Sequence, residues 1–223
     1  YRPAGTHDGY GVTGAGIPAT GYAFTNDVPP GKTGHSLTFI GNTAIAITNS
    51  STLDGGYMDT FDAGLTSMTV MTWAKGWPGG GWDPFVSKWG ESGLGWQLRR
   101  NGGSNPTWTV RGTGGVEDMW AGDLSMGNDG QWHHYAGTFT FDGVTGVRNL
   151  YVDGVLRATQ AEVASYVGSD MSHLTIGGRD NGGNNFGNYF TGGRIYGVRI
   201  YNVALSEAQI NSFRLSPVTP TFT

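Results

Sequence analysis

Short runs of alternating hydrophobic and polar residues recur along most of this 223-residue chain and predict β-strands. Most of the runs end at glycine or asparagine, residues that favour turns. Eleven candidate strands are His35–Phe39, Ala44–Thr48, Met68–Lys75, Pro84–Trp89, Gly95–Arg100, Thr107–Arg111, Trp132–Phe141, Arg148–Val152, Val155–Gln160, Ser172–Ile176 and Gly193–Tyr201. No long helical pattern separates them, so the chain is expected to be an all-β protein.

The connections between the candidate strands predict antiparallel sheets. Parallel neighbours need crossovers of about a dozen residues, usually helical, and these gaps are shorter and rich in Gly, Asn and Pro. Two hairpins are expected, one over Trp96–Arg111 with its turn at Asn101–Pro106, and one over Leu150–Leu156. The second turns at Asp153-Gly154, a pair typical of two-residue hairpin loops.

One short helical signature stands near the end of the chain. Ser206 can cap a helix whose third residue is Gln209, and the pattern predicts about one turn over Ser206–Ile210. The Pro-rich and Thr-rich segment 216–223 then has the composition of an extended linker. We therefore expect one domain over residues 1–215, followed by the start of a linker to neighbouring domains of a longer protein.

The composition supports a folded single domain and excludes some partners. Eight Trp, ten Tyr and ten Phe supply enough apolar surface for a core, while 40 Gly fit many tight turns. With a net charge of −4, the chain has no basic surface for a phosphate backbone, so a nucleic acid partner is not expected. No apolar run approaches the length of a membrane span, so no membrane partner is expected either.

Several segments, in order along the chain, resemble laminin-G-like jelly-roll domains of the concanavalin A-like lectin/glucanase superfamily. The clearest is Asp129–Phe139 followed by Leu150–Gly154, which is similar to the paired central strands of that family. Further matching segments are Ser36–Gly41, Met68–Trp73, Ile176–Gly178, Phe190–Ile195 and Val198–Asn202. The resemblance implies a two-sheet antiparallel β-sandwich, a jelly roll, in a family that holds both lectins and glycan-cleaving enzymes.

The central candidate strand has two different faces. Alternation puts Trp132, His134, Ala136 and Thr138 on one face, and His133, Tyr135, Gly137 and Phe139 on the other. We expect one face in the core and the other on the floor of a concave surface. The adjacent histidines point to opposite faces, so they cannot chelate one metal ion, and we expect one to be packed and the other exposed.

Tryptophans in glycine-rich loops are candidate platforms for sugar rings, because sugars present flat C–H faces that stack on aromatic rings. Trp77 and Trp82 lie in such a loop, and Trp120 lies beside Asp118 and Asp123. The alternative, equally weighted for each ring, is that it covers the core. Trp73, Trp96, Trp108 and Trp132 are expected in the core or on a sheet face, and Trp89 fits either place.

Polar groups that could surround a bound sugar come from two places. One face of the first hairpin carries Gln97, Arg99, Thr109 and Arg111, which on a concave surface would bind hydroxyls or a uronate and on a convex one would be ordinary solvated charges. The polar loop of residues 180–189 includes Asn184 and Asn185. Its amides suit sugars or calcium, although Asn and Gly also simply favour turns.

A calcium site is implied by the resemblance, because many relatives bind one ion through an Asp in an early strand and an acidic residue in the final strand. Here Ile40 stands at the first position, and Tyr196 or Gly197 at the second. The usual family site is therefore expected to be weak or absent. The loop carboxylates Asp8, Asp27 and Asp180 offer oxygens for a different structural calcium site.

The acidic residues do not form the patterns of known catalytic sites on this fold. The four Glu are Glu91, Glu117, Glu162 and Glu207, and none has an acidic residue two positions away, as the Glu-x-Asp-x-Glu strand of the related hydrolases requires. The Gln-Ile-His and Arg-x-Glu-x-Arg strands of alginate lyases are also missing, as is a Gly-x-Ser-x-Gly elbow.

These observations predict a non-catalytic, lectin-like carbohydrate-binding module of a secreted or cell-surface bacterial protein, with a polysaccharide or other glycan as its partner. Two alternatives stay open. One is a protein-adhesion or spacer module whose tryptophans serve packing only. The other is a glycoside hydrolase or polysaccharide lyase with an atypical site around Glu117, Asp118 and Asp123.

Overall fold

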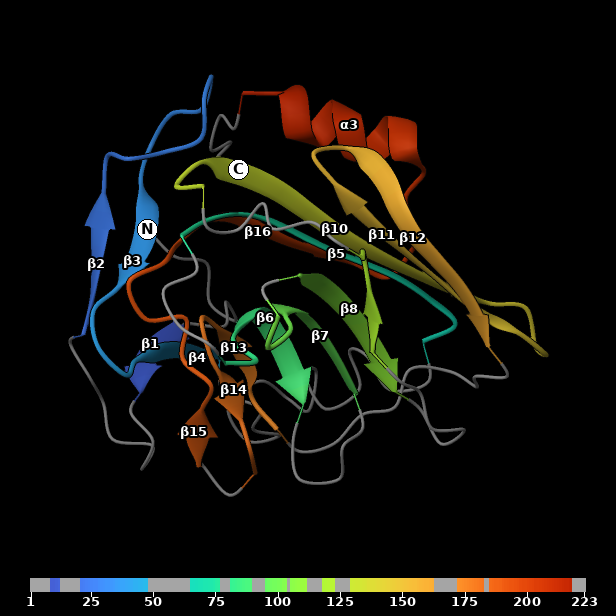
Figure 1. Cartoon of the computed structure of the whole chain (residues 1–223), viewed down its shortest axis with the longest axis horizontal. Helices are drawn as coiled ribbons and strands as arrows, with labels where there is room; N and C mark the ends of the chain where they lie inside the picture. Colours follow the sequence, from blue (N-terminus) through green and yellow to red (C-terminus); the bar gives the residue numbers. More distant parts are fainter. Residues whose placement is uncertain are drawn as a thin grey trace, which may run out of the picture.

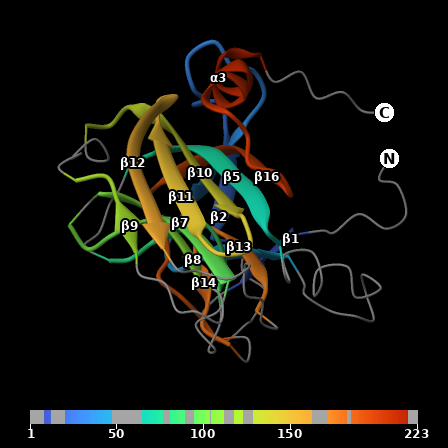
Figure 2. The ribbon, with the colours of Figure 1, turned by 90° about the vertical axis from the view of Figure 1, so that its right-hand side faces the viewer.

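Two seven-stranded antiparallel sheets lie face to face in the computed structural model (Figure 1, Figure 2). The structure describes residues 9–12, 21–47, 65–76, 81–89, 95–103, 105–111, 118–122, 129–162, 172–182 and 185–217. The jelly-roll sandwich predicted from the sequence is confirmed.

We name the two sheets A and B. Sheet A has the strand order β1 (Gly9–Val12), β4 (Ala44–Ile47), β13 (Leu174–Ile176), β6 (Pro84–Trp89), β7 (Gly95–Arg100), β8 (Pro106–Arg111) and β9 (Met119–Trp120). Sheet B has the order β12 (Val155–Glu162), β11 (Gly146–Val152), β10 (Trp132–Phe141), β5 (Ser67–Lys75), β16 (Arg194–Tyr201), β3 (Ser36–Phe39) and β2 (Tyr22–Thr25). A small pair, β14 (Arg179–Asp180) and β15 (Phe186–Gly187), forms a separate two-stranded sheet, with β14 packed beside β6.

All eleven predicted strands are present, most within one or two residues of the expected bounds. Both hairpins form, and the second turns with positive φ at Asp153 (53°) and Gly154 (78°), as a type I′ loop requires. The sequence did not predict β1, β2, β9, β14 or β15. These strands are two to four residues long, too short for alternation to be recognised.

The core fills the space between the sheets with large side chains from both. Trp96 and Trp108 are fully buried, which confirms their expected place, and the indole N–H of Trp108 donates to the Thr138 carbonyl oxygen at 2.9 Å. Phe85 of sheet A stacks on Tyr135 of sheet B with ring centroids 4.9 Å apart. The inward rows of the two sheets are thus joined by aromatic contacts as well as by burial.

A missing side chain at Gly137 makes room for Trp108. A Cβ at Gly137 would lie 2.2 Å from Cδ2 of the Trp108 ring, and both positions are in the closely packed core. We expect Gly137→Ala to lower the free energy of unfolding by about 1–3 kcal/mol, measured by urea denaturation. The control is Gly122→Ala, since a Cβ there meets nothing within 4 Å. Equal stability of the two variants would contradict this packing.

Helix α3 (Glu207–Leu215) is longer than the single turn predicted over Ser206–Ile210. The predicted cap is confirmed, because Ser206 and Gln209 form a capping box. The extra turn comes from packing on the outer face of sheet B, where Ile210 and Phe213 join a cluster with Met71, Ala136 and Tyr151. Such tertiary contacts stabilise a helix beyond its local propensity.

The packing of α3 corrects two expectations about β10. The face of Ala136 lies under α3, so this part of the strand is covered and is not the floor of an open binding surface (Figure 1). His133 and His134 are consecutive residues of β10 and point to opposite faces, as expected. Both are buried, however, at 9% and 3% exposure. Asp153 covers the first and Trp73 contacts the second.

In the described part of the chain, no helix is long and apolar enough to cross a membrane.

Candidate functional site

The outer face of sheet A carries a row of polar and aromatic side chains. Register places Ser87, Gln97 and Thr109 side by side on β6, β7 and β8, while Trp96, Leu98 and Trp108 point into the core. Arg99 follows Gln97 on the same face of β7, two residues further along. The sequence predicted this polar set, and the structure places its members together.

A hollow of about 300 Å³ opens at one end of this face, which we call the sheet A site. Its lining residues are Trp82, Arg99, Asp118, Arg179 and Asn188. They come from segments far apart in the sequence: the residues just before β6, strand β7, the residue before β9, strand β14 and the loop after β15. A pocket of this size is at the small end of ligand sites.

Arg99 and Asp118 form the charged centre of the sheet A site. One terminal nitrogen of Arg99 donates to both carboxylate oxygens of Asp118 at 2.6 Å, and Thr109 Oγ1 also donates to Oδ1 of Asp118. Arg99 is only 7% exposed. Because both groups are held by partners and neighbouring strands, their positions are fixed before any ligand binds.

Trp82 is the exposed aromatic residue of the site. Its side chain is 42% exposed, and the Arg99 guanidinium lies 4.7 Å from the ring centroid, within cation–π range. A Cβ at Gly102 would lie 3.7 Å from Trp82 Nε1, so this edge of the indole rests against the β7–β8 turn. Trp82 is thus a supported ring with a free surface, as stacking on a sugar requires.

Arg179 adds a second cation beside Arg99. Arg179 and Arg99 line the same hollow, and burial together with the neighbouring charge of Arg99 lowers the pKa of Arg179. Arg179 Nε donates to Oδ1 of Asn181 at 2.6 Å, a contact that fixes its direction. Two cations and one carboxylate leave the described part of the hollow positively charged.

A second tryptophan–arginine pair lies at the other end of the same face. Arg111 lies 5.6 Å from the ring centroid of Trp89, and Gly95 of β7 pairs with both residues in the sheet register. Arg99 stands four positions after Gly95, a distance of about 13 Å along a strand. The two pairs therefore mark the ends of a polar track across sheet A, whose middle residues Ser87, Gln97 and Thr109 are at most 1% exposed.

The floor of the track holds unpaired polar atoms. Oγ of Ser87 and both amide atoms of Gln97 are buried and have no hydrogen-bond partner in the structure as described. The same is true of Arg99 Nε. Buried polar groups are rarely left unpaired, and where they are, a ligand or water commonly completes them.

The predicted site residues fall into three groups. Trp82 and Arg99 meet in the hollow, with Gln97 beside them and Arg111 at the far end of the track. Trp120 is 51% exposed and pairs with Thr107 on the edge of sheet A, outside the hollow, and Asn185 is exposed next to β15. Trp77 and Asn184 lie outside the described residues.

Sequence reasoning missed Arg179 as a site residue, and it included Asn188 only as a member of the polar loop of residues 180–189. Arg179 is on a strand of two residues, which is too short to be predicted from a sequence pattern. It reaches sheet A only because β14 packs beside β6. Asn188 has a positive φ of 51°, which Asn tolerates better than most residues, and the run of Asn and Gly was the one available signal. The sequence offered Asp118 as a neighbour of Trp120 and as a member of the atypical catalytic site with Glu117 and Asp123, and not as a binding partner of Arg99.

The carboxylates suggested for calcium have other partners. Asp27 accepts hydrogen bonds from Lys75 and Trp132, and Asp180 accepts from the backbone and ring of His173. Asp8 lies outside the described residues. Among the residues with described positions, no three His, Cys, Asp or Glu side chains form a group able to hold a metal ion. A structural calcium ion stays an untested prediction.

The chain belongs to the concanavalin A-like lectin/glucanase superfamily, whose family model matches residues 40–211. This match confirms the resemblance inferred from the central strands. A search of the curated proteins finds no match to this sequence.

Solved structures share the fold at low sequence identity. The binding domain of Paraclostridial Mosquitocidal Protein 1 superposes with a TM-score of 0.61 and 14% identity over 92% of this chain, which spans 50% of that protein. Domain 4 of AbnA, a GH43 extracellular arabinanase from Geobacillus stearothermophilus, in complex with arabinotriose, gives a TM-score of 0.57 and 14% identity, covering 92% of this chain and 86% of that one. The CBM40 of Ruminococcus gnavus IT-sialidase, bound to alpha2,3 sialyllactose, gives 0.56 and 17%, covering 76% and 95%.

Proposed function

We propose that this protein is a non-catalytic carbohydrate-binding module that holds a polysaccharide on the outer face of sheet A. The observation that carries the proposal is the exposed ring of Trp82 beside the fixed Arg99–Asp118 pair in a hollow of about 300 Å³. Two of the similar structures contain bound saccharides, arabinotriose and sialyllactose, which supports the same class of ligand here.

The chemistry of the site suits a sugar ring. The face of Trp82 offers a surface for C–H groups, while Arg99, Arg179 and Asn188 supply donors around it. Asp118 supplies acceptor oxygens, so both the donor and the acceptor functions of a hydroxyl group can be met. The positive balance of the hollow favours a sugar that carries a carboxylate over a neutral one.

The Asp118 carboxylate is a binding group in this proposal and not a catalytic acid. Its oxygens accept hydrogen bonds from Arg99 and Thr109, so it is engaged by a cation and is not free to protonate a glycosidic oxygen. Glu117 and Asp123, its partners in the enzyme alternative, lie outside the described residues. Assays for reducing ends and for unsaturated products on a polysaccharide panel test that alternative directly.

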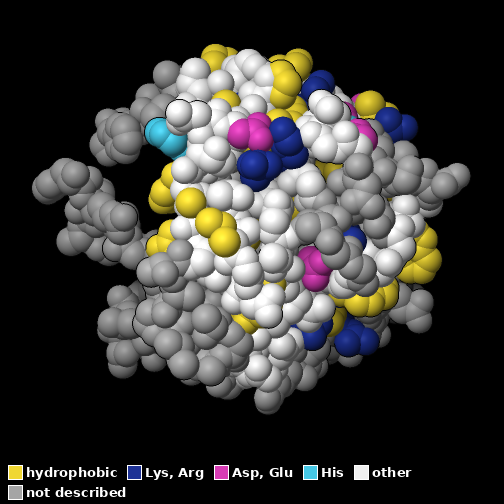
Figure 3. Space-filling model, turned by 60° about the vertical axis from the view of Figure 1, so that its left-hand side comes forward, with side chains coloured by type: hydrophobic (Ala, Val, Ile, Leu, Met, Phe, Trp, Pro, Cys, Tyr) yellow, Lys and Arg dark blue, Asp and Glu magenta, His cyan; other side chains and the backbone are white. Residues whose placement is uncertain are grey.

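The proposed binding role also indicates what kind of protein contains this domain. A binding module raises the local concentration of a polysaccharide for an attached enzyme or for a cell surface. We therefore infer a secreted or cell-surface bacterial protein with further domains. On the face drawn in Figure 3 the described hydrophobic side chains form small separate groups, and a pull-down partner bound without any sugar affinity would favour the adhesion alternative.

We expect Trp82→Ala to weaken polysaccharide binding at least about tenfold, because a ring at the centre of a sugar site contributes a large share of the affinity. Glycan arrays and affinity gels with plant, algal and bacterial polysaccharides measure the effect. Phe24→Ala is the matched control, since this residue is 70% exposed on β2 of the other sheet. Equal retention of the wild type and the Trp82→Ala variant on every retarding gel would contradict the proposed site.

A further inference from the structure

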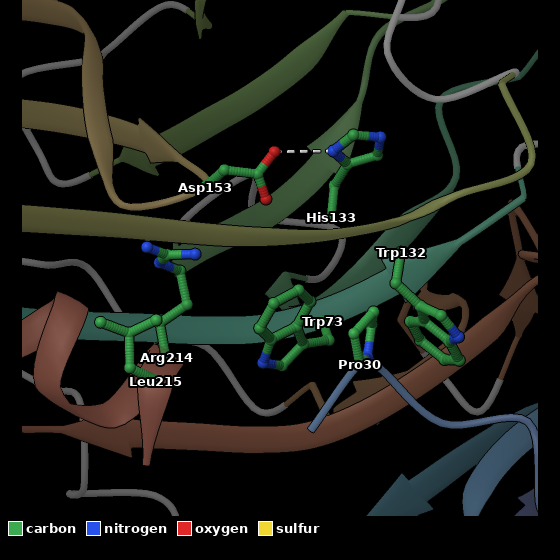
Figure 4. A pocket seen from close by; sticks show the side chains of 7 residues that line it. All are labelled: Pro30, Trp73, Trp132, His133, Asp153, Arg214 and Leu215. Atoms are coloured by element: carbon green, nitrogen blue, oxygen red, sulfur yellow. Dashed lines mark hydrogen bonds and ion pairs between the residues drawn. The ribbon is translucent and has the colours of Figure 1, made fainter. Parts of the chain in front are cut away.

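A second cavity, of about 310 Å³, lies on the opposite side of the molecule, where α3 ends over the outer face of sheet B. We call it the α3 pocket. Figure 4 shows its lining, which comes from five different elements. The lining residues are Pro30, Trp73, Trp132, His133, Asp153, Arg214 and Leu215.

The two indole rings of the pocket stand on neighbouring strands. Trp73 of β5 is directly opposite His134 of β10, and Trp132 is two residues before His134. Trp73 and Trp132 are therefore diagonal neighbours on the same face, about 7–8 Å apart at the backbone. Both are partly exposed, so their free surfaces line one cavity (Figure 4).

Contacts behind the rings hold both in place. The Trp132 indole N–H donates to Asp27 Oδ1 at 2.9 Å, and Asp27 is itself held by Lys75 and Arg194. Trp73 meets the edge of the His134 ring, with centroids 5.2 Å apart, and the Lys32 ammonium lies 5.9 Å from its ring centroid. Rings fixed in this way lose little freedom when a ligand binds.

The rim of the pocket offers both an acceptor and a donor. Asp153 Oδ2 accepts from the His133 ring at 2.7 Å and Oδ1 from the His134 backbone N–H at 2.9 Å, which fixes the carboxylate at the β11–β12 turn. Arg214 donates from Nε to Asn211 at 2.9 Å, and its terminal nitrogens make no hydrogen bond with another described residue. Those nitrogens are available to a ligand.

We propose that the α3 pocket is a second saccharide site, independent of the sheet A site, which takes a sugar ring with free neighbouring hydroxyl groups. The ring lies against Trp73 and Trp132, Arg214 donates to one hydroxyl oxygen and Asp153 accepts from another. A polyproline segment also fits between tryptophans, but its residues offer only carbonyl acceptors, so it would donate no hydrogen bond to Asp153 beyond those the carboxylate already accepts from His133 and His134. The paired donor and acceptor therefore favour the sugar.

The two sites lie on the outer faces of opposite sheets, so one molecule can hold two glycan segments at once. Binding at two points on one polymer strengthens attachment by about 10²–10⁴ without any new contact. Two glycan chains can equally be joined by one module. This inference goes beyond the proposed function, because either site can act without the other.

The test is ¹⁹F NMR of protein labelled with fluorotryptophan, titrated with the methyl glycosides of glucose, galactose, xylose, arabinose and glucuronic acid. Single Trp→Phe variants assign the signals of Trp73, Trp82 and Trp132. We expect at least one glycoside to shift the Trp73 and Trp132 signals together, in the wild type and in Trp82→Ala. Arg214→Gln is expected to lower the affinity measured from those shifts at least about tenfold. Arg157→Gln, on the exposed edge strand β12, is expected to leave that affinity unchanged.

Two results would overturn the second site. One is that no glycoside moves the Trp73 and Trp132 signals, which leaves the sheet A site standing if the Trp82 signal moves. The other is that oligoproline shifts these signals and no sugar does. Arg214→Gln avoids the ambiguity of an unfolded variant, because the side chain is only partly buried at the end of α3 and its loss leaves both indoles in place.

Discussion

Replacing Arg100 with methionine is expected to lower the free energy of unfolding by about 3–5 kcal/mol. The Arg100 side chain is 1% exposed and donates from Nε and a terminal nitrogen to Asp83 Oδ2 at 3.2 and 2.8 Å. Burial raises the pKa of Asp83 although Arg100 opposes that shift. Without the guanidinium, the carboxyl group would be left buried and unpaired, which costs far more than the ion pair itself contributes.

Two measurements separate this explanation from a simple loss of packing. Urea denaturation of Arg100→Met with Asp83→Leu is expected to recover most of the lost stability, because both charges are then gone. The single variant is also expected to be relatively less destabilised at acidic pH, where the Asp83 carboxyl group is protonated. A double variant as unstable as the single one would contradict the role of the unpaired charge.

Acidification is expected to destabilise the protein through His134. Burial, and then the positive charge of Arg214, lower the pKa of His134 from 6.5 to about 3. Below about pH 6.5 the unfolded chain therefore binds a proton that the folded protein does not accept until about pH 3. The free energy of unfolding should fall by about 0.7 kcal/mol per pH unit near pH 6.5 and by about 1.4 kcal/mol per pH unit further into that window, or roughly 2 kcal/mol between pH 6.5 and pH 4.5.

His134→Phe tests this dependence, since Phe keeps a ring beside Trp73 and cannot take up the proton. Nδ1 of His134 has no hydrogen-bond partner among the described groups, so nothing is lost there. Urea titrations of both proteins at several pH values should show a shallower decline for the variant. The carboxylates with lowered pKa, such as Asp153, lose their stabilisation at lower pH in both proteins. Parallel declines would show that another group is responsible.

The fold was predictable because its signals are local and repeated. Strands such as Trp132–Phe141 and the turn at Asp153-Gly154 are specified by alternation and by turn residues, which need no tertiary information. The length of α3 was not predictable, because its second turn depends on contacts with Met71, Ala136 and Tyr151 of sheet B. The sequence of such a short helix does not show which sheet face the helix will cover.

The candidate site was predictable in part, for a related reason. Trp82 and Arg99 could be named from a glycine-rich loop and from the face of a hairpin, both of which are properties of single segments. Arg179 and Asn188 come to the hollow only through long-range packing, and the pairing of Trp73 with Trp132 depends on the register between β5 and β10. Such register is set by the whole sheet and not by either strand.

Strand β16 has a consequence for how the protein is made. It lies between β5 and β3, so sheet B is divided into two pieces until residues 194–201 are available. During synthesis the ribosome releases these residues near the end of the domain, and the facing edges of β3 and β5 stay open until then. Folding therefore has to wait for one of the last segments, and a chain that stops before Arg194 would expose two strand edges to other nascent chains.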